Sequence, residues 1–190
     1  MTPTPREALI SCYRRLHAHG LNDAHSGNVS IRDGDAIWIT PTGACADELS
    51  VNDLVRCELD GRCGEGASLD APLHLKVYRL NAEAQAVVHS HGPHIVALTL
   101  DGEDFVPPDF EGRLYFPRVP VISIAYSEYV ERSPDMVAAV LSDHRIAVVR
   151  GHGMYAQAES LDLAYKWTCS LEQSAKTAFI AQLAGTLPPQ

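Results

Sequence analysis

The sequence predicts a single α/β or α+β domain in which helices pack on a sheet. Three observations predict it. The 190 residues are enough for one domain with a substantial core and too few for two. Short β-type runs alternate with helical patterns along the chain, without internal repeats or a low-complexity linker. The composition, 46% hydrophobic and 21% charged, is that of an ordinary globular protein.

The expected helices begin and end at residues that favour helix ends. Pro5 suits the first turn of a helix that Gly20 ends. Asp70 is a good N-cap for a second helix, and Ser133 with Pro134 begins a later one. In chain order, the expected helices are residues 5–20, 70–80, 94–100, 133–141 and 160–183.

The expected strands are short runs of mostly apolar residues bounded by turns. A turn at residues 33–35 joins the first two strands, and Pro41 breaks the second. The proline-rich stretch 101–118 predicts an irregular loop over one face, and residues 187–190 predict a frayed tail. In chain order, the expected strands are residues 28–31, 36–40, 54–59, 86–91, 119–124 and 146–149.

Charge and hydropathy limit the classes of partner. Asp and Glu total 24 against 15 Lys and Arg, a net charge of −9, which argues against nucleic acid because phosphate binding needs clustered basic residues. No apolar run approaches the ~18–20 residues of a membrane helix. The polar, proline-rich start does not resemble a signal peptide. We therefore expect a cytoplasmic protein whose partner is a small molecule.

The cysteines predict free thiols. There are five, an odd number, and no Cys-x-x-Cys pair occurs. This pattern argues against a disulfide framework or a thiolate zinc site and favours unpaired thiols in a reducing compartment.

Three histidines form a pattern typical of a catalytic metal site. His89 and His91 lie two residues apart at the end of an expected strand, so both rings point to one face and reach one ion. His152 follows a different strand, between Gly151 and Gly153, which leave room beside its ring. Three imidazoles and an open position suit catalytic zinc, with Zn–N distances of ~2.0–2.1 Å, although other divalent transition metals fit too. An isolated His-x-His pair on a strand more often consists of hydrogen-bonded or surface histidines than of metal ligands.

Asp70 and three tyrosines have alternative interpretations. Asp70 is either an N-cap only or a carboxylate at the edge of the metal, where it would carry a proton. Tyr115, Tyr126 and Tyr129 are either packing aromatics or phenols that donate a proton. Residues 26–28 and 40–43 stand at strand ends and are either plain turns or a pocket of N–H groups and short polar side chains for an anionic or polyhydroxy ligand.

Five segments of the chain occur in the order seen in one known family. The sequence resembles the class II aldolase/adducin family, the group of L-fuculose-phosphate aldolase and L-ribulose-5-phosphate 4-epimerase. The resemblance covers about residues 6–183 and rests on Ser26-Gly27-Asn28-Val29-Ser30, Thr40-Pro41-Thr42-Gly43, Ser68-Leu69-Asp70 with His74 and Tyr78, Ala86-Val87-Val88-His89-Ser90-His91, and Gly151-His152-Gly153.

The resemblance implies one domain over residues 1–190, a three-layer αβα fold with a central, mostly antiparallel sheet. It also implies a homotetramer with active sites near subunit boundaries. His89, His91 and His152 carry over as ligands of Zn²⁺. The residues that carry over as the phosphate or substrate pocket are Gly27, Asn28, Thr42, Gly43 and Ser68.

Three departures from the family pattern bear on the substrate. Asp70 stands where the aldolases have Glu and the epimerases Asp. Leu69 replaces the second of two successive serines in the sugar-phosphate members, which removes a hydroxyl donor and makes a smaller or unphosphorylated substrate plausible. The chain ends soon after the last helix, where the family's sugar-phosphate enzymes supply a tyrosine. No counterpart of the epimerases' loop Asp can be placed, and Arg113 lies near that point.

These features predict a zinc-dependent aldolase-type lyase of carbohydrate metabolism. It would cleave or form a C–C bond in a small hydroxy-keto substrate, sugar-phosphate or keto-acid-like, through a metal-bound enediolate. Asp70 would move the proton at the nucleophilic carbon, and Tyr126 would serve the aldehyde oxygen. The alternatives are a decarboxylase or a sugar-phosphate 4-epimerase on the same metal site, or a non-catalytic adducin-like assembly module.

Overall fold

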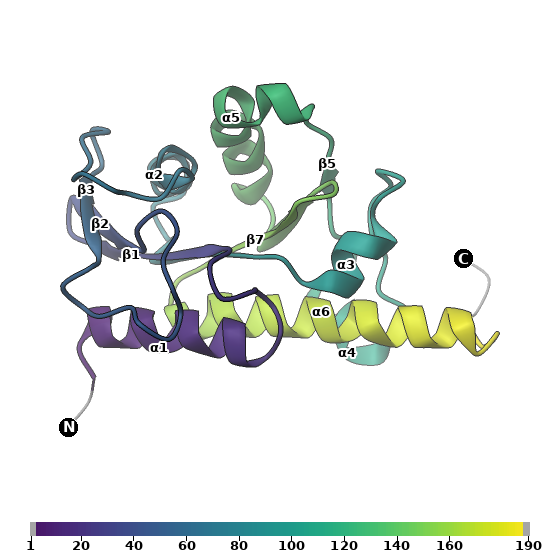
Figure 1. Ribbon diagram of the computed structural model, residues 1–190. Helices are drawn as coiled ribbons and strands as arrows, with labels where there is room; N and C mark the ends of the chain where they lie inside the picture. Colours follow the sequence, from purple (N-terminus) through teal and green to yellow (C-terminus); the bar gives the residue numbers. More distant parts are fainter. Residues whose placement is uncertain (1–2, 188–190) are drawn as a thin grey trace.

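The computed structural model describes residues 3–187, which form a seven-stranded sheet between two layers of helices (Figure 1). The strand order is β3-β2-β1-β4-β7-β6-β5, and every neighbouring pair is antiparallel except β5 with β6. The mixed fold with a mostly antiparallel sheet is therefore confirmed. The strands are β1 (Asn28–Asp33), β2 (Ala36–Ile39), β3 (Val55–Glu58), β4 (Ala86–Ser90), β5 (Val121–Ile122), β6 (Ile146–Val149) and β7 (Gly153–Ala158).

The helices cover both faces of the sheet. α1 and α6 run along one face, and α2 and α5 lie on the other (Figure 1). The helices are α1 (Pro5–Ala18), α2 (Ala71–Leu80), α3 (Pro93–Leu98), α4 (Phe110–Tyr115), α5 (Tyr129–Leu141) and α6 (Leu161–Leu183), with a 3₁₀ turn at Tyr126–Glu128. Among residues 3–187, no helix combines the length and apolar character needed to cross a membrane.

The side chains of β4 show why two helical layers are needed. Ala86 and Val88 join the apolar core under α1 and α6, whereas Val87 joins the core under α2 and α5. Successive residues of a strand point to opposite faces, so a strand that is apolar throughout must be covered on both sides. By the same alternation His89 lies on the α2/α5 face.

The structure differs from the expected elements at β7, α4 and the start of α5. The chain continues after the glycine turn as β7, which a three-residue hairpin loop joins to β6. Gly151 has a φ of +69° in that loop, the left-handed conformation that such hairpins need. The stretch 101–118 contains α4, which Asp109 caps by accepting from the N–H of Gly112. α5 begins at Tyr129, so Pro134 lies inside the helix and Ser133 is not its N-cap.

The expectation of five free thiols is wrong for two of them. Cys57 and Cys63 form a disulfide, and Cys12, Cys45 and Cys169 are free. A turn after β3 brings the chain back so that Cys63 lies directly opposite Cys57. The predicted tail at residues 188–190 lies outside the described residues.

Candidate active site

Three imidazole rings converge at the ends of the central strands. His89 is in β4, His91 follows it, and His152 lies in the hairpin loop between β6 and β7. The Nε2 atom of His89 lies 2.8 Å from Nε2 of His91 and 3.3 Å from Nε2 of His152. One ligand atom from each ring falls within 4.8 Å of the other two. Two ligands of a tetrahedral ion with Zn–N of ~2.0–2.1 Å stand roughly 3.3 Å apart, so the donor set fits a divalent metal.

The tautomer and charge of the rings suit metal binding. The Nδ1–H of His89 donates to the carbonyl of Met154 at 3.0 Å, which leaves Nε2 with its lone pair towards the other rings. Burial holds the pKa of His89 well below its ordinary value and lowers the pKa of His91 to about 4. Burial also lowers the pKa of His152. All three rings are therefore neutral at pH 7, which is the form that binds a cation.

Asp70 presents a buried carboxylate beside these rings. It stands at the start of α2, yet its side chain makes no capping hydrogen bond. Its Oδ2 accepts from Asn28 Nδ2 at 2.8 Å and lies 3.9 Å from Nε2 of His89. Burial raises the pKa of this carboxyl, but the hydrogen bonds from Asn28 and Tyr129 lower it, so the carboxyl is ionised at neutral pH. Asp70 therefore does not cap α2 with its side chain, and its carboxylate lies beside the three histidines.

Two phenols hold the other contacts of Asp70. Tyr129, the first residue of α5, donates to Oδ1 at 2.8 Å, and Tyr155 of β7 donates to Oδ2 at 2.9 Å. The two hydroxyls also hydrogen-bond to each other. Burial raises the pKa of both phenols, so each keeps its proton at neutral pH. The ring of Tyr129 also meets His152, with ring centroids 4.7 Å apart.

A cavity of about 760 Å³ contains all the site residues expected from the sequence. Its lining includes His89, His91, His152, Asp70, Tyr126, Gly27, Asn28, Thr42, Gly43 and Ser68. The chain thus gathers residues from β1, the turn after β2, the start of α2, β4, and the loops before α5 and after β6.

The expected anion pocket is built from turns whose polar groups are partly engaged. The Thr42 hydroxyl donates to the carbonyl of Ala67, and Ser68 Oγ accepts from the N–H of Asp70. Among residues 3–187, no acceptor lies within hydrogen-bond distance of the Ser68 hydroxyl proton. Gly27 has a φ of +69°, and a Cβ there would lie 2.6 Å from the carbonyl oxygen of His89, so only glycine fits beside the metal site.

The tyrosines are placed differently from one another. Tyr126 lines the cavity with 99% of its side chain exposed, and no hydrogen bond joins it to Asp70 within the described structure. Tyr115 packs on Trp167, away from the cavity. Tyr155 was not among the residues that the sequence singled out, because the strand that carries it was not expected. Its position three residues after His152 was the available signal.

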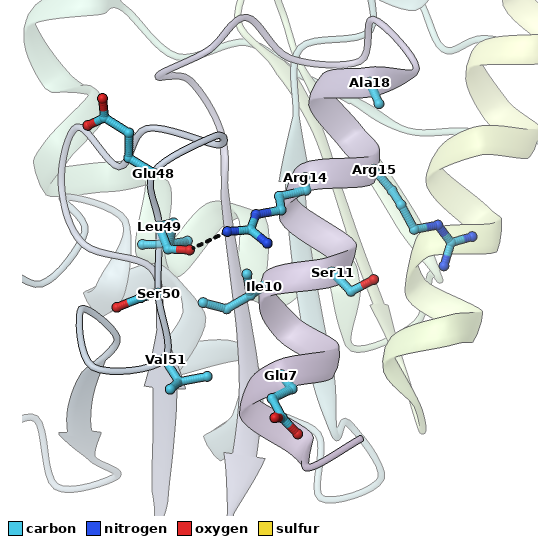
Figure 2. Close-up of a pocket in the computed structure, with 10 residues that line it drawn as sticks. All are labelled: Glu7, Ile10, Ser11, Arg14, Arg15, Ala18, Glu48, Leu49, Ser50 and Val51. Carbon is cyan, nitrogen blue, oxygen red and sulfur yellow. Dashed lines mark hydrogen bonds between the residues drawn. The ribbon is translucent and has the colours of Figure 1, made fainter. Parts of the chain in front are cut away.

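A second hollow, of about 470 Å³, runs along α1 beside residues 48–51 (Figure 2). Figure 2 shows Arg14 reaching from α1 to the carbonyl of Leu49. The same side chain also donates to the carbonyl of Ala46. Its guanidinium is therefore occupied by the chain's own backbone. The lining contains no histidine or cysteine, in contrast to the histidine cavity.

Known proteins are similar to this chain over nearly its whole length. The family model described as Class II Aldolase and Adducin N-terminal domain matches residues 7–179. L-fuculose phosphate aldolase of Methanocaldococcus jannaschii is 26% identical over 178 residues, 92% of this chain and 96% of that protein. The 3-oxo-tetronate 4-phosphate decarboxylase of Haemophilus influenzae is 28% identical, over 93% of this chain and 88% of that protein. The crystal structure of L-fuculose-1-phosphate aldolase from Thermus thermophilus matches with a TM-score of 0.88 and 33% identity, over 96% of each chain.

Proposed function

This chain belongs to the class II aldolase and adducin family, and we propose that it is a metal-dependent lyase that cleaves or forms a C–C bond in a small hydroxy-keto substrate. The observation that carries the proposal is the convergence of three neutral imidazoles, with ligand atoms within 4.8 Å of one another, beside an ionised carboxylate in one cavity. An assembly module needs no such arrangement, whereas a lyase uses both parts.

We assign His89, His91 and His152 as the ligands of one divalent ion, Zn²⁺ in the first place, with another divalent transition metal as the alternative. When bound, the ion supplies a Lewis acid that polarises the substrate carbonyl. The hydrogen bond from His89 to Met154 fixes the orientation of the ring at the centre of the set.

Asp70 is the proposed proton carrier at the nucleophilic carbon. Because its hydrogen bonds lower its pKa, it is ionised at neutral pH and starts the reaction as the base. Three donors on Asn28, Tyr129 and Tyr155 hold the carboxylate in place, so it is oriented before the substrate arrives.

The proposed substrate pocket consists of Gly27, Asn28, Thr42, Gly43 and Ser68, which would hold the anionic or polyhydroxy end of the substrate. Leu69 lines the same cavity with 61% of its side chain exposed. The Ser68 hydroxyl can donate to a phosphate oxygen, so the pocket suits a sugar phosphate. Leu69 offers no donor, so the pocket also suits a smaller, keto-acid-like compound.

Tyr126 is the phenol that we propose as proton donor to the aldehyde oxygen, since it lines the cavity and its hydroxyl has no hydrogen-bond partner among the described residues, whereas that of Tyr129 donates to Asp70. Replacing Tyr126 with phenylalanine is expected to lower kcat by about 10²-fold with unchanged metal content. Tyr115→Phe, outside the cavity, is the matched control. Full activity of Tyr126→Phe together with a loss in Tyr129→Phe would transfer the role to Tyr129.

Decarboxylation is the second candidate reaction. Loss of CO₂ from a 3-keto acid leaves an electron pair on the carbon next to the carbonyl, as aldol cleavage does. The same site would therefore stabilise the negative charge that develops in either reaction. A decarboxylase among the relatives supports this alternative.

We also propose that the protein is a cytoplasmic homotetramer in carbohydrate metabolism. Large apolar side chains stand exposed on α4 and the end of α6, which supports burial against another subunit. They are Phe110, Leu114, Ile180 and Leu183.

Removal of the metal provides the test of the proposed function. We expect the purified protein to carry one divalent ion per chain, and a chelator to abolish turnover that added Zn²⁺ restores. Turnover is measured on L-fuculose 1-phosphate by aldehyde release and on 3-oxo-tetronate 4-phosphate by CO₂ release, each beside its unphosphorylated form. A metal-free, stable protein that turns over none of these compounds would contradict the lyase proposal.

A further inference from the structure

We propose that Tyr155 is a positioning residue that fixes the metal ligand His89 and the carboxylate of Asp70 relative to each other. The inference rests on the proposed function, because it concerns the same site. Two independent contacts carry it, one made by the ring of Tyr155 and one by its hydroxyl.

The ring of Tyr155 supports the ring of His89. In the β4–β7 pairing the two residues lie directly opposite each other, so both side chains leave the sheet on one face. Their ring centroids are 3.9 Å apart and their planes differ by 3°, a parallel stack. Both side chains are buried. The flat contact prevents the imidazole from tilting, which keeps Nε2 towards His91 and His152.

The hydroxyl of Tyr155 supports the carboxylate. It donates to Oδ2 of Asp70 at 2.9 Å, on the oxygen that lies 3.9 Å from Nε2 of His89. One rigid side chain therefore touches the metal ligand with its face and the proposed base with its end. A tyrosine ring has few rotatable bonds, so these two points are held at a fixed separation.

The hydroxyl also gives Tyr129 an alternative acceptor. Each phenol has one proton, yet the hydroxyls of Tyr129 and Tyr155 and the carboxylate of Asp70 make three contacts with one another. When Tyr129 donates to Tyr155, and Tyr155 to Oδ2, the Oδ1 atom of Asp70 loses its donor and can accept a proton from substrate. Tyr155 thereby allows the carboxylate to stay hydrogen-bonded through Oδ2 while Oδ1 accepts the proton.

Two substitutions separate the two contacts. Tyr155→Phe keeps the stack on His89 and removes the hydroxyl, so we expect metal affinity near that of the wild type and kcat lowered about 10- to 100-fold, with little change in KM. Tyr155→Leu removes both contacts, so we expect the metal affinity to fall by about 10- to 100-fold as well. Metal affinity is measured by titration of the apoprotein with Co²⁺, whose absorption spectrum also reports ligand geometry.

A second buried tyrosine is the matched control. The Tyr78 hydroxyl bonds to Ser30, away from Asp70 and the metal ligands. Tyr78→Phe should lower the melting temperature as Tyr155→Phe does, but leave the Co²⁺ spectrum, the metal affinity and kcat unchanged. Melting curves identify any variant that fails to fold, and Tyr155→Phe, which keeps the core volume, still decides the hydroxyl's role if Tyr155→Leu does not fold.

Failure of this inference differs from failure of the proposed function. Wild-type kcat in Tyr155→Phe would overturn the role of the hydroxyl, and wild-type metal affinity in Tyr155→Leu would overturn the role of the stack, while the wild-type enzyme stays metal-dependent. A wild-type protein that binds no Co²⁺ or Zn²⁺ would instead contradict the proposed function itself.

Discussion

Replacing His89 with alanine is expected to remove the metal and reduce kcat/KM by about 10³-fold or more, because the Lewis acid supplies several kcal/mol to the reaction. His89 is the central ring of the set: its Nε2 lies 2.8 Å from that of His91 and 3.3 Å from that of His152. Without it the remaining two imidazoles leave a divalent ion with too few protein ligands. Metal content by mass spectrometry and steady-state kinetics measure the two effects.

The matched control is His144→Ala. His144 is exposed after α5 and does not line the histidine cavity. This variant should keep the metal content and kcat/KM of the wild type. If His89→Ala were as metal-rich as His144→Ala, the proposed ligand set would be wrong. Because the His89 ring is fully buried, its loss also leaves a cavity, so melting curves must show that the variant is folded before the kinetics are interpreted.

Replacing Asp70 with asparagine is expected to lower kcat by about 10²- to 10⁴-fold while the metal stays bound, since the carboxylate moves the proton but is not one of the three assigned ligands. The amide cannot serve as the base. Its NH₂ group would also replace one of the two acceptor oxygens and face either Tyr129 or the pair of donors on Asn28 and Tyr155, so we expect the free energy of unfolding to fall by about 1–3 kcal/mol.

Metal analysis, melting curves and kinetics on the same Asp70→Asn preparation separate these effects. Asp135→Asn is the control, because Asp135 is an exposed carboxylate of α5 paired with Lys76 and lies outside the cavity. It should match the wild type in all three measurements. Full turnover in Asp70→Asn would exclude Asp70 from the mechanism.

Most elements of the fold follow from local sequence signals. Pro5 begins α1, a capping box at Thr4 completes its first turn, and the apolar run at residues 86–90 forms the central strand. Strand β7 was missed because the glycines around His152 look like the end of a strand, although in the structure they form a hairpin loop. The start of α5 was missed because a proline usually stands in the first turn of a helix, whereas here the helix begins five residues before Pro134.

The candidate site was predictable where it depends on short sequence spacing. The two-residue separation of His89 and His91 places both rings on one side of a strand, and the structure brings His152 to them. The sequence left the role of Asp70 open, since an N-cap and a base use the same residue type, and the carboxylate's contacts with Asn28 and two phenols favour the base. Tyr155 could not be found in this way, because its contact with His89 depends on how two distant strands pair.

The pairing of β4 with β7 couples folding to function in one further respect. His89 faces Tyr155 in the same register that assigns Val88 and Ala156 to one core and Val87 to the other. A one-residue insertion in either strand would turn every side chain beyond it to the opposite face. The apolar residues that allow the sheet to fold therefore also fix the alignment of the catalytic groups. A chain with a shifted strand register would misfold rather than form a folded but inactive enzyme.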